Sequence, residues 1–293
     1  MTAVDLTAGR GGHAVQMAKQ VGPTGSIALF DLDRTNLDYA AKRVERVAGL
    51  KPLAFPGSFA SIGRSLAGAE VCGDGFLADL GFASNQVADA ERGFSFKADG
   101  PIDMRMDTDS PLKAEDLLAS LSLDELAKLI REYGEDPMAN RIASKIVAAR
   151  AVTPIQSTAY LAQLVCEAYG PHRTREARVH PATRTFQALR IAVNDELGAL
   201  KAMLDEFERA AIGLGRDRVG WLAPGARLVV ISFHSLEDRL VKKRFAAWGQ
   251  AGLLKDRAAP MTGPTDAESA ANPRARSAKL RWVAFRPLEA ARS

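Results

Sequence analysis

The chain has 293 residues, of which 47% are hydrophobic and 25% are charged, and its formal net charge is +4. This length suggests one large domain or two smaller ones, with ample apolar residues for a packed core. Cys72 and Cys166 lie far apart and in no metal-type spacing, so we expect no disulfide framework and no metal site. No apolar run approaches the length of a membrane span, and no signal peptide is evident. We therefore expect a cytoplasmic protein that does not bind a membrane.

A glycine-rich segment near the N-terminus is the most informative motif: Asp5-Leu6-Thr7-Ala8-Gly9-Arg10-Gly11-Gly12-His13. It follows a short apolar run and precedes a helical pattern at 14–21. Glycines let a backbone approach a ligand closely, and a helix start presents free N–H groups to it. Asp31 ends the next apolar run, where a carboxylate can accept both hydroxyls of a ribose. The pattern predicts a pocket for a nucleoside cofactor.

The glycine loop alone leaves the cofactor open. Gly9, Gly11 and Ala14 satisfy the relaxed dinucleotide spacing, so an NAD-dependent oxidoreductase is one interpretation. Enzymes that use S-adenosylmethionine (AdoMet) have a similar loop, which gives a second interpretation. In the third, the segment binds no ligand and is a turn that only packs a helix on a strand.

The first part of the chain alternates strands and helices. We expect strands at 3–6, 26–30, 52–55 and 75–80, separated by helices at 13–21, 35–47 and 58–66. Such alternation predicts a parallel sheet covered by helices on both faces. Ligands of these sheets lie beyond the carboxyl ends of the strands, where Asp31 and Asp79 are expected.

The second part of the chain changes character. A polar segment at 89–111 is followed by helical patterns at 123–133, 138–149 and 158–168, and then by one long helix from 181 to about 211. An apolar stripe runs along that long helix at Phe186, Leu189, Val193, Leu197, Leu200 and Leu204. Strands return at 226–233, after the turn Pro224-Gly225, and at 278–285. We predict a helical domain (93–195) inserted into a cofactor-binding α/β domain (1–92 and 196–293).

The segments 91–96 and 99–107 place two phenylalanines and two methionines among Arg and Asp. This loop could close over a flat ligand, because aromatic faces stack on bases. Alternatively, it is a domain hinge with its apolar side chains buried. The composition does not separate these two interpretations.

Basic residues gather in three places, at 173–190, 239–244 and 274–292. Local basic clusters on a chain of low net charge favour an anionic partner, although each cluster alone could be solvated surface. His234, Ser235 and Asp238 have the residue types of a hydrolase triad. They lack the glycine–serine–glycine elbow, which argues against acyl transfer.

Several long strings together resemble the bacterial small-subunit ribosomal RNA cytosine-N4 methyltransferases (RsmH, earlier MraW). They include ERGFSF, DGPIDMRMD and ISFHSLEDR, and they occur over nearly the whole chain in the family's order. The resemblance implies a class I AdoMet-dependent methyltransferase fold, a Rossmann-like α/β sheet with an inserted all-helical domain. It implies methyl transfer to the N4 amino group of cytosine 1402 in the decoding region of 16S rRNA. The implied partners are this RNA or the small subunit, and no oligomeric state is implied.

The resemblance also assigns residues. The implied AdoMet contacts are Gly11, Gly12, His13, Asp31, Phe59, Asp79 and Gln86. For the proton acceptor, Asp79 is the first candidate, Asn85 the second and His180 the third. The arginines expected to bind the RNA backbone are Arg173, Arg175, Arg178, Arg184 and Arg190.

The chain departs from the family pattern in three places. The family usually has a short segment ahead of the first strand, whereas this sequence starts at the strand. Two interpretations therefore stay open, a cofactor site that is less covered and a catalytically inactive RNA-binding protein. Leu32 stands where Arg is common, and Ala83 stands where Ser is usual.

Overall fold

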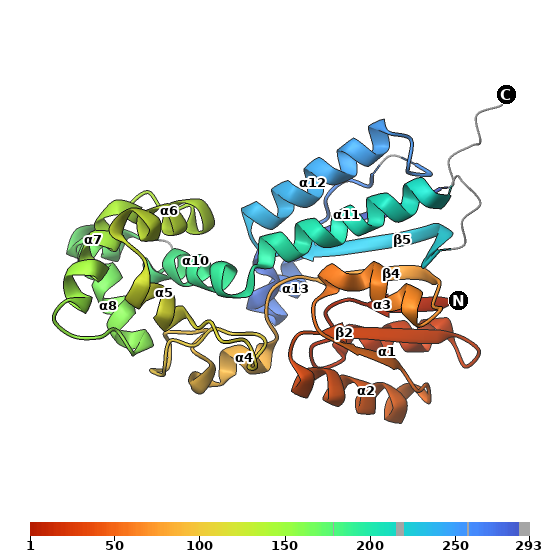
Figure 1. Cartoon of the computed structure of the whole chain (residues 1–293), viewed down its shortest axis with the longest axis horizontal. Helices are drawn as coiled ribbons and strands as arrows, with labels where there is room; N and C mark the ends of the chain where they lie inside the picture. Colours follow the sequence, from red (N-terminus) through yellow and green to blue (C-terminus); the bar gives the residue numbers. More distant parts are fainter. Residues whose placement is uncertain (178, 215–219, 257, 287–293) are drawn as a thin grey trace. The chain divides into compact units, whose positions relative to one another are not determined.

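The computed structural model describes residues 1–177, 179–214, 220–256 and 258–286. The chain divides into two compact units (Figure 1). The sheet unit consists of Met1–Gly81 and Leu197–Ser293, and the helical unit consists of Phe82–Glu196. A helical region inserted into an α/β unit is the arrangement that the sequence predicted. No helix in the described part of the chain is long and apolar enough to cross a membrane.

The sheet unit is built on a six-stranded sheet within the described residues, in the order β3-β2-β1-β4-β5-β6. All pairs are parallel except β5 with β6, which are antiparallel. The order reverses between β1 and β4, and in open α/β sheets this switch point is where ligands bind. The strands are β1 (Thr2–Asp5), β2 (Ser26–Asp31), β3 (Leu53–Pro56), β4 (Gly73–Asp79), β5 (Leu222–Ser232) and β6 (Lys279–Ala284).

Helices cover both faces of this sheet because its central strands are apolar on both sides. In β2, Ile27 and Leu29 pack against α1 (Gly12–Val21) and α2 (Arg34–Ala48). Their neighbours Ala28 and Phe30 point to the other face, as the two-residue period of a strand requires. That face is covered by α3 (Ile62–Gly68), α11 (Glu196–Leu214) and α12 (Ser235–Gln250).

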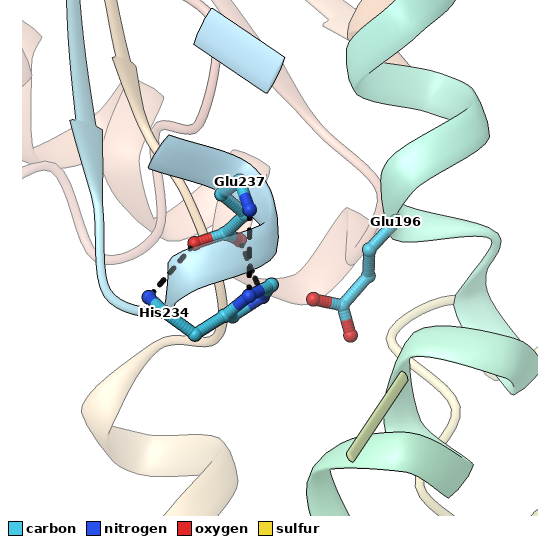
Figure 2. Close-up of side chains that lie close together, drawn as sticks. All are labelled: Glu196, His234 and Glu237. Atoms are coloured by element: carbon cyan, nitrogen blue, oxygen red, sulfur yellow. Dashed lines mark hydrogen bonds and ion pairs between the residues drawn. The ribbon is translucent and has the colours of Figure 1, made fainter. Parts of the chain in front are cut away.

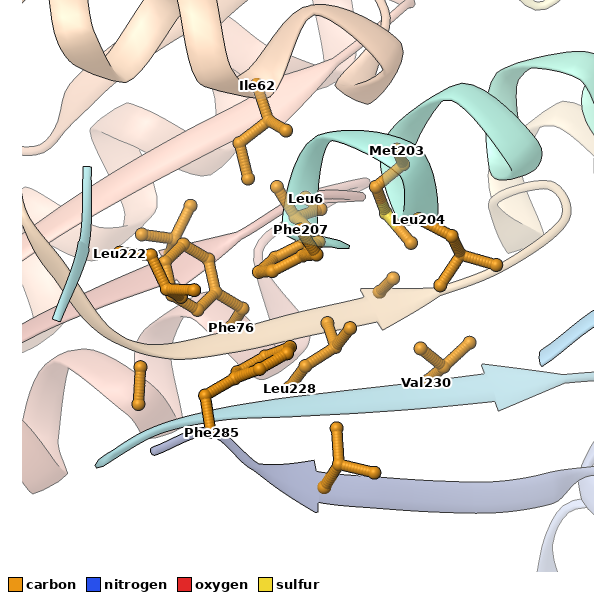
Figure 3. Packing of buried hydrophobic residues seen from close by; sticks show 14 of the residues in the cluster. Leu6, Ile62, Phe76, Met203, Leu204, Phe207, Leu222, Leu228, Val230 and Phe285 are labelled. Carbon is orange, nitrogen blue, oxygen red and sulfur yellow. The ribbon is translucent and has the colours of Figure 1, made fainter. Parts of the chain in front are cut away.

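The core between the sheet and α11 is rich in aromatic side chains (Figure 3). Phe207 of α11 packs edge-on against Phe76 of β4, with ring centroids 5.0 Å apart, and stacks on Phe285 at 5.8 Å. All three rings are at most 2% exposed. Their contacts join β4, α11 and the end of β6 in one core, and the backbone pairing of β4 with β5 places the side chains that follow these two strands.

The helical unit has its own apolar core. Ile102 and Met104 are fully buried in it together with Phe186 and Leu189 of α10. Its helices are α4 (Ser84–Ala88), α5 (Ala114–Ser120), α6 (Leu123–Gly134), α7 (Ala139–Arg150), α8 (Thr158–Tyr169), α9 (Pro171–Glu176) and α10 (Ala182–Asn194). The helical unit also contains the short turn η2 (Ala90–Arg92). The sheet unit contains three further short elements, η1 (Phe59–Ser61), α13 (Asp266–Ala271) and η3 (Pro273–Ser277).

The prediction of one long helix from 181 to 211 was wrong. Asp195 has a left-handed backbone, with φ of 45°, and separates α10 from α11. The apolar stripe is continuous in sequence but feeds two cores: Phe186 and Val193 belong to the core of the helical unit, and Leu200 to that of the sheet unit. The break therefore lies at the boundary between the units.

Two other boundaries differ from those expected. The first division between units follows Gly81 rather than residue 92, because Arg92 donates to the carbonyl groups of Arg105 and Met106 inside the helical unit. The second follows Glu196 rather than residue 195. The segment Pro224-Gly225 lies within β5 instead of preceding it, where the pairing with β4 shifts register.

Candidate cofactor and substrate site

The glycine loop lies between β1 and α1 and is fastened to the end of β2. The N–H of Gly9 donates to Asp31 Oδ2 at 2.7 Å. Gly11 has φ of 75°, and a Cβ placed on it would lie 3.1 Å from the Cα of Ala40 in α2. A Cβ on Gly12, the first residue of α1, would meet nothing within 4 Å. The loop thus packs tightly against α2 while the start of α1 stays open.

Asp31 is the acid at the end of β2. Its carboxylate accepts the N–H of Gly9 at 2.7 Å and that of Asp33 at 2.8 Å. Burial raises the pKa of Asp31 to about 6, against the lowering effect of these two hydrogen bonds. Each carboxylate oxygen has a second lone pair, so the group can still accept ribose hydroxyls.

Asp79 ends β4 and connects to the glycine loop from the other side. Its N–H donates to Thr7 Oγ1 at 2.7 Å, and its Oδ2 lies 3.4 Å from His13 Nε2. The hydrogen bond that His13 donates to this carboxylate raises the pKa of His13. Among the described residues, Asp79 Oδ1 is buried and has no hydrogen-bond partner.

Sequence reasoning did not single out Asp5 as a site residue. It ends β1 and is 1% exposed, and burial raises its pKa to about 7. Oδ1 accepts the N–H of Thr7 at 3.1 Å, while Oδ2 is buried without a hydrogen-bond partner in the described part of the chain. The sequence signal that could have identified Asp5 is an acid at the end of a short apolar strand, directly before a glycine loop.

Phe59 follows β3 in the short turn η1. Its ring is half-buried and packs against the core of the sheet unit. The turn is fixed by Ser58 Oγ, which accepts the N–H of Ala60 at 3.1 Å. It is joined to β2 because the N–H of Gly57 donates to the carbonyl oxygen of Asp31 at 2.9 Å. Phe59 is therefore placed near the carboxyl edge of β2.

Three predicted site residues belong to the helical unit. Asn85 and Gln86 lie in α4, where Gln86 is buried and its Oε1 accepts the N–H of Ala83 at 2.8 Å. His180 precedes α10, and its Nδ1 accepts the N–H of Ala182 at 3.2 Å. Its ring lies 4.6 Å from that of Phe96. His180 thus has a local role at the start of α10.

The predicted RNA-binding arginines have unequal surroundings. Arg173 and Arg175 are exposed on α9. Arg184 is also exposed and donates to the carbonyl oxygen of Glu135 at 2.8 Å. Arg190 donates to both carboxylate oxygens of Glu196, at 2.7 and 2.9 Å. Arg178 lies outside the described residues.

The polar face of α10 binds backbone groups of its own unit. Asn194 donates to the carbonyl oxygen of Met104 at 2.8 Å and accepts the N–H of Met106 at 2.7 Å. Gln187 donates to the carbonyl oxygen of Tyr133 at 2.9 Å. Ile102, Met104 and Met106 are buried, so of the two interpretations of this loop the structure favours burial of its apolar side chains.

His234, Ser235 and Asp238 do not form a hydrolase triad. Figure 2 shows His234 closing the start of α12: its Nδ1 accepts the N–H of Glu237, and its Nε2 lies 3.2 Å from Glu237 Oε1. Asp238 accepts a hydrogen bond from Arg281 at 2.7 Å instead. Glu196, also drawn there, belongs to the helical unit.

Comparisons with known proteins identify the family. The profile of the MraW methylase family matches residues 1–286. A protein of Geobacter sulfurreducens named "Ribosomal RNA small subunit methyltransferase H" is 46% identical, with 95% of this chain and 90% of that protein covered. A protein of the same name from Koribacter versatilis is 43% identical, with 97% and 87% covered.

A solved structure of a putative rRNA methylase from Clostridium thermocellum is similar to the chain with a TM-score of 0.42 and 10% identity, covering 97% of this chain and 88% of that one. The family profile and the two curated relatives span almost the whole sequence, and their names agree with the resemblance carried by the motifs. The chain therefore belongs to the MraW methylase family.

Proposed function

We propose that this protein transfers a methyl group from AdoMet to the N4 amino group of a cytidine in small-subunit ribosomal RNA, at cytosine 1402. The observation that carries the proposal is the pair of acids at the carboxyl edge of the sheet, one on each side of β1. Asp31 and Asp79 end β2 and β4 on either side of the glycine loop. The relatives named ribosomal RNA small subunit methyltransferase H support the choice of RNA as substrate.

The residues at this edge fit AdoMet. Asp31 accepts the ribose hydroxyls, and Phe59 lies beside the adenine. Gly11 lets the loop pack against α2, and Gly12 leaves room at the start of α1, where no side chain of the described residues caps the free N–H groups. Those N–H groups suit the carboxylate of the methionine portion. Asp5 and Asp79 each have a buried carboxylate oxygen without a hydrogen-bond partner among the described residues. Such oxygens favour a ligand that carries a positive charge.

His13 and Gln86 complete the proposed set of cofactor contacts. His13 lies beside Asp79, and the carboxylate of Asp79 holds its ring in place. Gln86 is buried in α4, and its side-chain oxygen accepts the N–H of Ala83 at 2.8 Å.

AdoMet supplies a methyl group that is already electrophilic, so the protein acts mainly by alignment. The amino nitrogen of cytosine is a poor nucleophile because its lone pair is delocalised into the ring. A hydrogen-bond acceptor localises that pair and receives the proton that leaves nitrogen. Asp79 Oδ1 is the first candidate for this acceptor because it is buried and has no partner among the described residues. Asn85 and His180 are the second and third candidates.

We further propose that the helical unit, predicted as 93–195, recognises the RNA. Arg173 and Arg175 on α9 are exposed and suit phosphate groups. Arg173, Arg175 and Arg184 each donate to one neutral acceptor, Met138 Sδ or the carbonyl oxygens of Pro171 and Glu135. Arg190 is already neutralised by both carboxylate oxygens of Glu196, so we expect a smaller contribution from it. The target cytidine must be unpaired, or extruded from a helix, to reach the acceptor.

The test is methyl transfer to RNA by the purified protein. We expect label from methyl-tritiated AdoMet in 16S rRNA or small subunits isolated from cells lacking the gene, and mass mapping should locate N4-methylcytidine at position 1402. Asp79→Asn should lower kcat and also raise the Kd for AdoMet, because Asp79 belongs to the proposed cofactor contacts as well as being the first candidate acceptor. RNA binding without any transfer by the wild-type protein would instead identify a catalytically inactive RNA-binding protein.

A second measurement separates the two cofactors that the glycine loop leaves open. Thermal unfolding should shift upward with AdoMet and stay unchanged with NAD, because a ligand stabilises only the state that binds it. A shift with NAD alone would contradict the proposal and favour an oxidoreductase.

A further inference from the structure

The short turn η3 lies at the same edge of the sheet as the candidate site. In the antiparallel pair β5–β6, Lys279 at the start of β6 is opposite Ser232 at the end of β5. Because Pro273–Ser277 directly precedes β6, it lies at the carboxyl edge of β5. In the neighbouring pair, Asp79 of β4 is opposite Ile231 of β5. Figure 1 shows α13, which leads into η3, at this end of β5.

The fold of η3 turns two arginines outward. Ala275 is 7% exposed and anchors the turn, whereas Arg274 and Arg276 on either side of it are exposed. Asn272 Oδ1 accepts the N–H of Arg274 at 3.3 Å, and the N–H of Ala278 donates to the carbonyl oxygen of Ala275 at 2.8 Å. The backbone of the turn is therefore fixed from both ends while the two arginine side chains project from it.

These two arginines differ from the other cations of the same segment. Lys279 and Arg281 both bind Asp238, and Arg286 donates to the carbonyl oxygen of Gly252. Within the described ranges, neither Arg274 nor Arg276 makes an ion pair or a side-chain hydrogen bond. Their charge is therefore available to an outside anion, and a guanidinium matches the geometry of a phosphate group.

We propose that Arg274 and Arg276 bind backbone phosphates of the RNA strand next to the nucleotide that is methylated. The inference rests on the proposed function, and it adds to the arginines of the helical unit an RNA contact made by the sheet unit itself. An RNA strand that brings one base to the carboxyl edge of β4 must carry its flanking phosphates past the neighbouring strand end, where η3 lies. Phosphate contacts of this kind set the position of a nucleic acid without reading its sequence.

The test compares two double variants that each lose two positive charges. Arg274→Gln/Arg276→Gln removes the proposed contacts. Arg46→Gln/Lys51→Gln is the matched control, because both residues are exposed. Arg46 lies in the last turn of α2 and Lys51 just after it, and α2 runs from the carboxyl end of β2 towards the opposite edge of the sheet. The probe is a fluorescein-labelled, single-stranded RNA with the 16S decoding sequence, and its Kd is measured by anisotropy between about 50 and about 200 mM KCl.

We expect the η3 variant to bind this RNA about tenfold more weakly at the low salt concentration and to lose about 1.4 from the slope of log K against log salt, since each single-strand phosphate contact contributes about 0.7. The control should keep the wild-type slope. Both variants should bind AdoMet with the wild-type Kd. Arg274→Lys/Arg276→Lys should recover most of the slope, because it restores the charge.

Equal slopes for the η3 variant and the control would overturn the inference, as would a lysine variant that behaves like the glutamine one. Weaker AdoMet binding in the η3 variant would assign these arginines to the cofactor site instead, and would also contradict the inference. None of these outcomes depends on catalysis. Failure of the wild-type protein to transfer methyl groups would contradict the proposed function and leave the salt slopes interpretable.

Discussion

One polar side chain of the helical unit and two acids of the sheet unit contrast in how fully their hydrogen bonds are satisfied. In the helical unit, the side chain of Asn194 satisfies both a carbonyl oxygen and an N–H of the loop at Met104–Met106. At the carboxyl edge of the sheet unit, Asp5 and Asp79 each keep a buried oxygen without a hydrogen-bond partner among the described residues. A satisfied polar group stabilises the fold, whereas an unsatisfied one costs stability and is available to a ligand. The contrast is local to these residues, because the helical unit also has buried polar atoms without a partner in the described part of the chain, among them Asp136 Oδ2 and Thr185 Oγ1.

The largest effect is expected from Asp5, where the unsatisfied acid should cost stability at neutral pH. Burial raises its pKa from 3.8 to about 7, so the folded state holds a proton that the unfolded chain releases. Stability should therefore fall as the pH rises from about 4 to about 7 and level off above that. Asp5→Asn should remove this loss and raise the free energy of unfolding at pH 8 by up to about 4 kcal/mol.

Urea unfolding at several pH values measures this effect. Glu45→Gln is the control, since Glu45 is an exposed acid on α2 and should leave the wild-type pH profile unchanged. If Asp5→Asn and the wild-type protein lost stability in parallel between pH 4 and pH 7, the acid at the end of β1 would be satisfied and the contrast with Asn194 would not hold.

The next effect concerns ligand binding at the same edge. Asp31→Ala should weaken AdoMet binding at least about 100-fold, roughly 3 kcal/mol, because it removes the proposed acceptor of both ribose hydroxyls. Isothermal titration gives the Kd, and circular dichroism shows whether the loop survives the loss of the hydrogen bonds from Gly9 and Asp33. A folded Asp31→Ala protein with unchanged affinity would contradict the assignment of the ribose site.

In the helical unit the same kind of deletion should act on stability. Asn194→Ala leaves the carbonyl oxygen of Met104 and the N–H of Met106 without their side-chain partner, which should cost about 2 kcal/mol. The matched control is Gln163→Ala, because Gln163 is exposed and, among the residues that the structure describes, its side chain bonds only to Glu167 in the same helix. That change should stay within about 0.5 kcal/mol. Equal losses for the two variants would show that the bonds of Asn194 contribute nothing beyond a surface pair.

The contrast also explains which features the sequence could predict. The glycine loop and Asp31 follow from short-range patterns, an apolar strand, a run of glycines and an acid at the next strand end, and the structure has them as expected. The break at Asp195 left no trace, because the apolar stripe of α10 continues into α11 with the same period. Asn194 binds residues 88 and 90 positions away along the chain, and no local pattern encodes such a contact.

The smallest expected effects concern the pH dependence of ligand binding, which should have two phases, of which only the second distinguishes the two ligands. Asp31 has a pKa of about 6, raised by burial, and its ionised form is the better acceptor for ribose hydroxyls. The affinity for AdoMet and for S-adenosylhomocysteine should therefore rise together, by up to about tenfold, as the pH goes from about 5 to about 6.5. Both ligands carry the same ribose, so this phase does not distinguish them.

Above about pH 6.5 the two ligands should separate. Asp5, with its pKa of about 7, ionises in that range, and only AdoMet carries the sulfonium charge that an added carboxylate at the end of β1 attracts. AdoMet should gain a further twofold or so in affinity by about pH 8, while S-adenosylhomocysteine stays level. Asp5→Asn should abolish that second phase and keep the first. A second phase of equal size for both ligands would show that Asp5 does not sense the sulfonium, but a charge that both ligands carry, such as the amino group of their amino-acid portion.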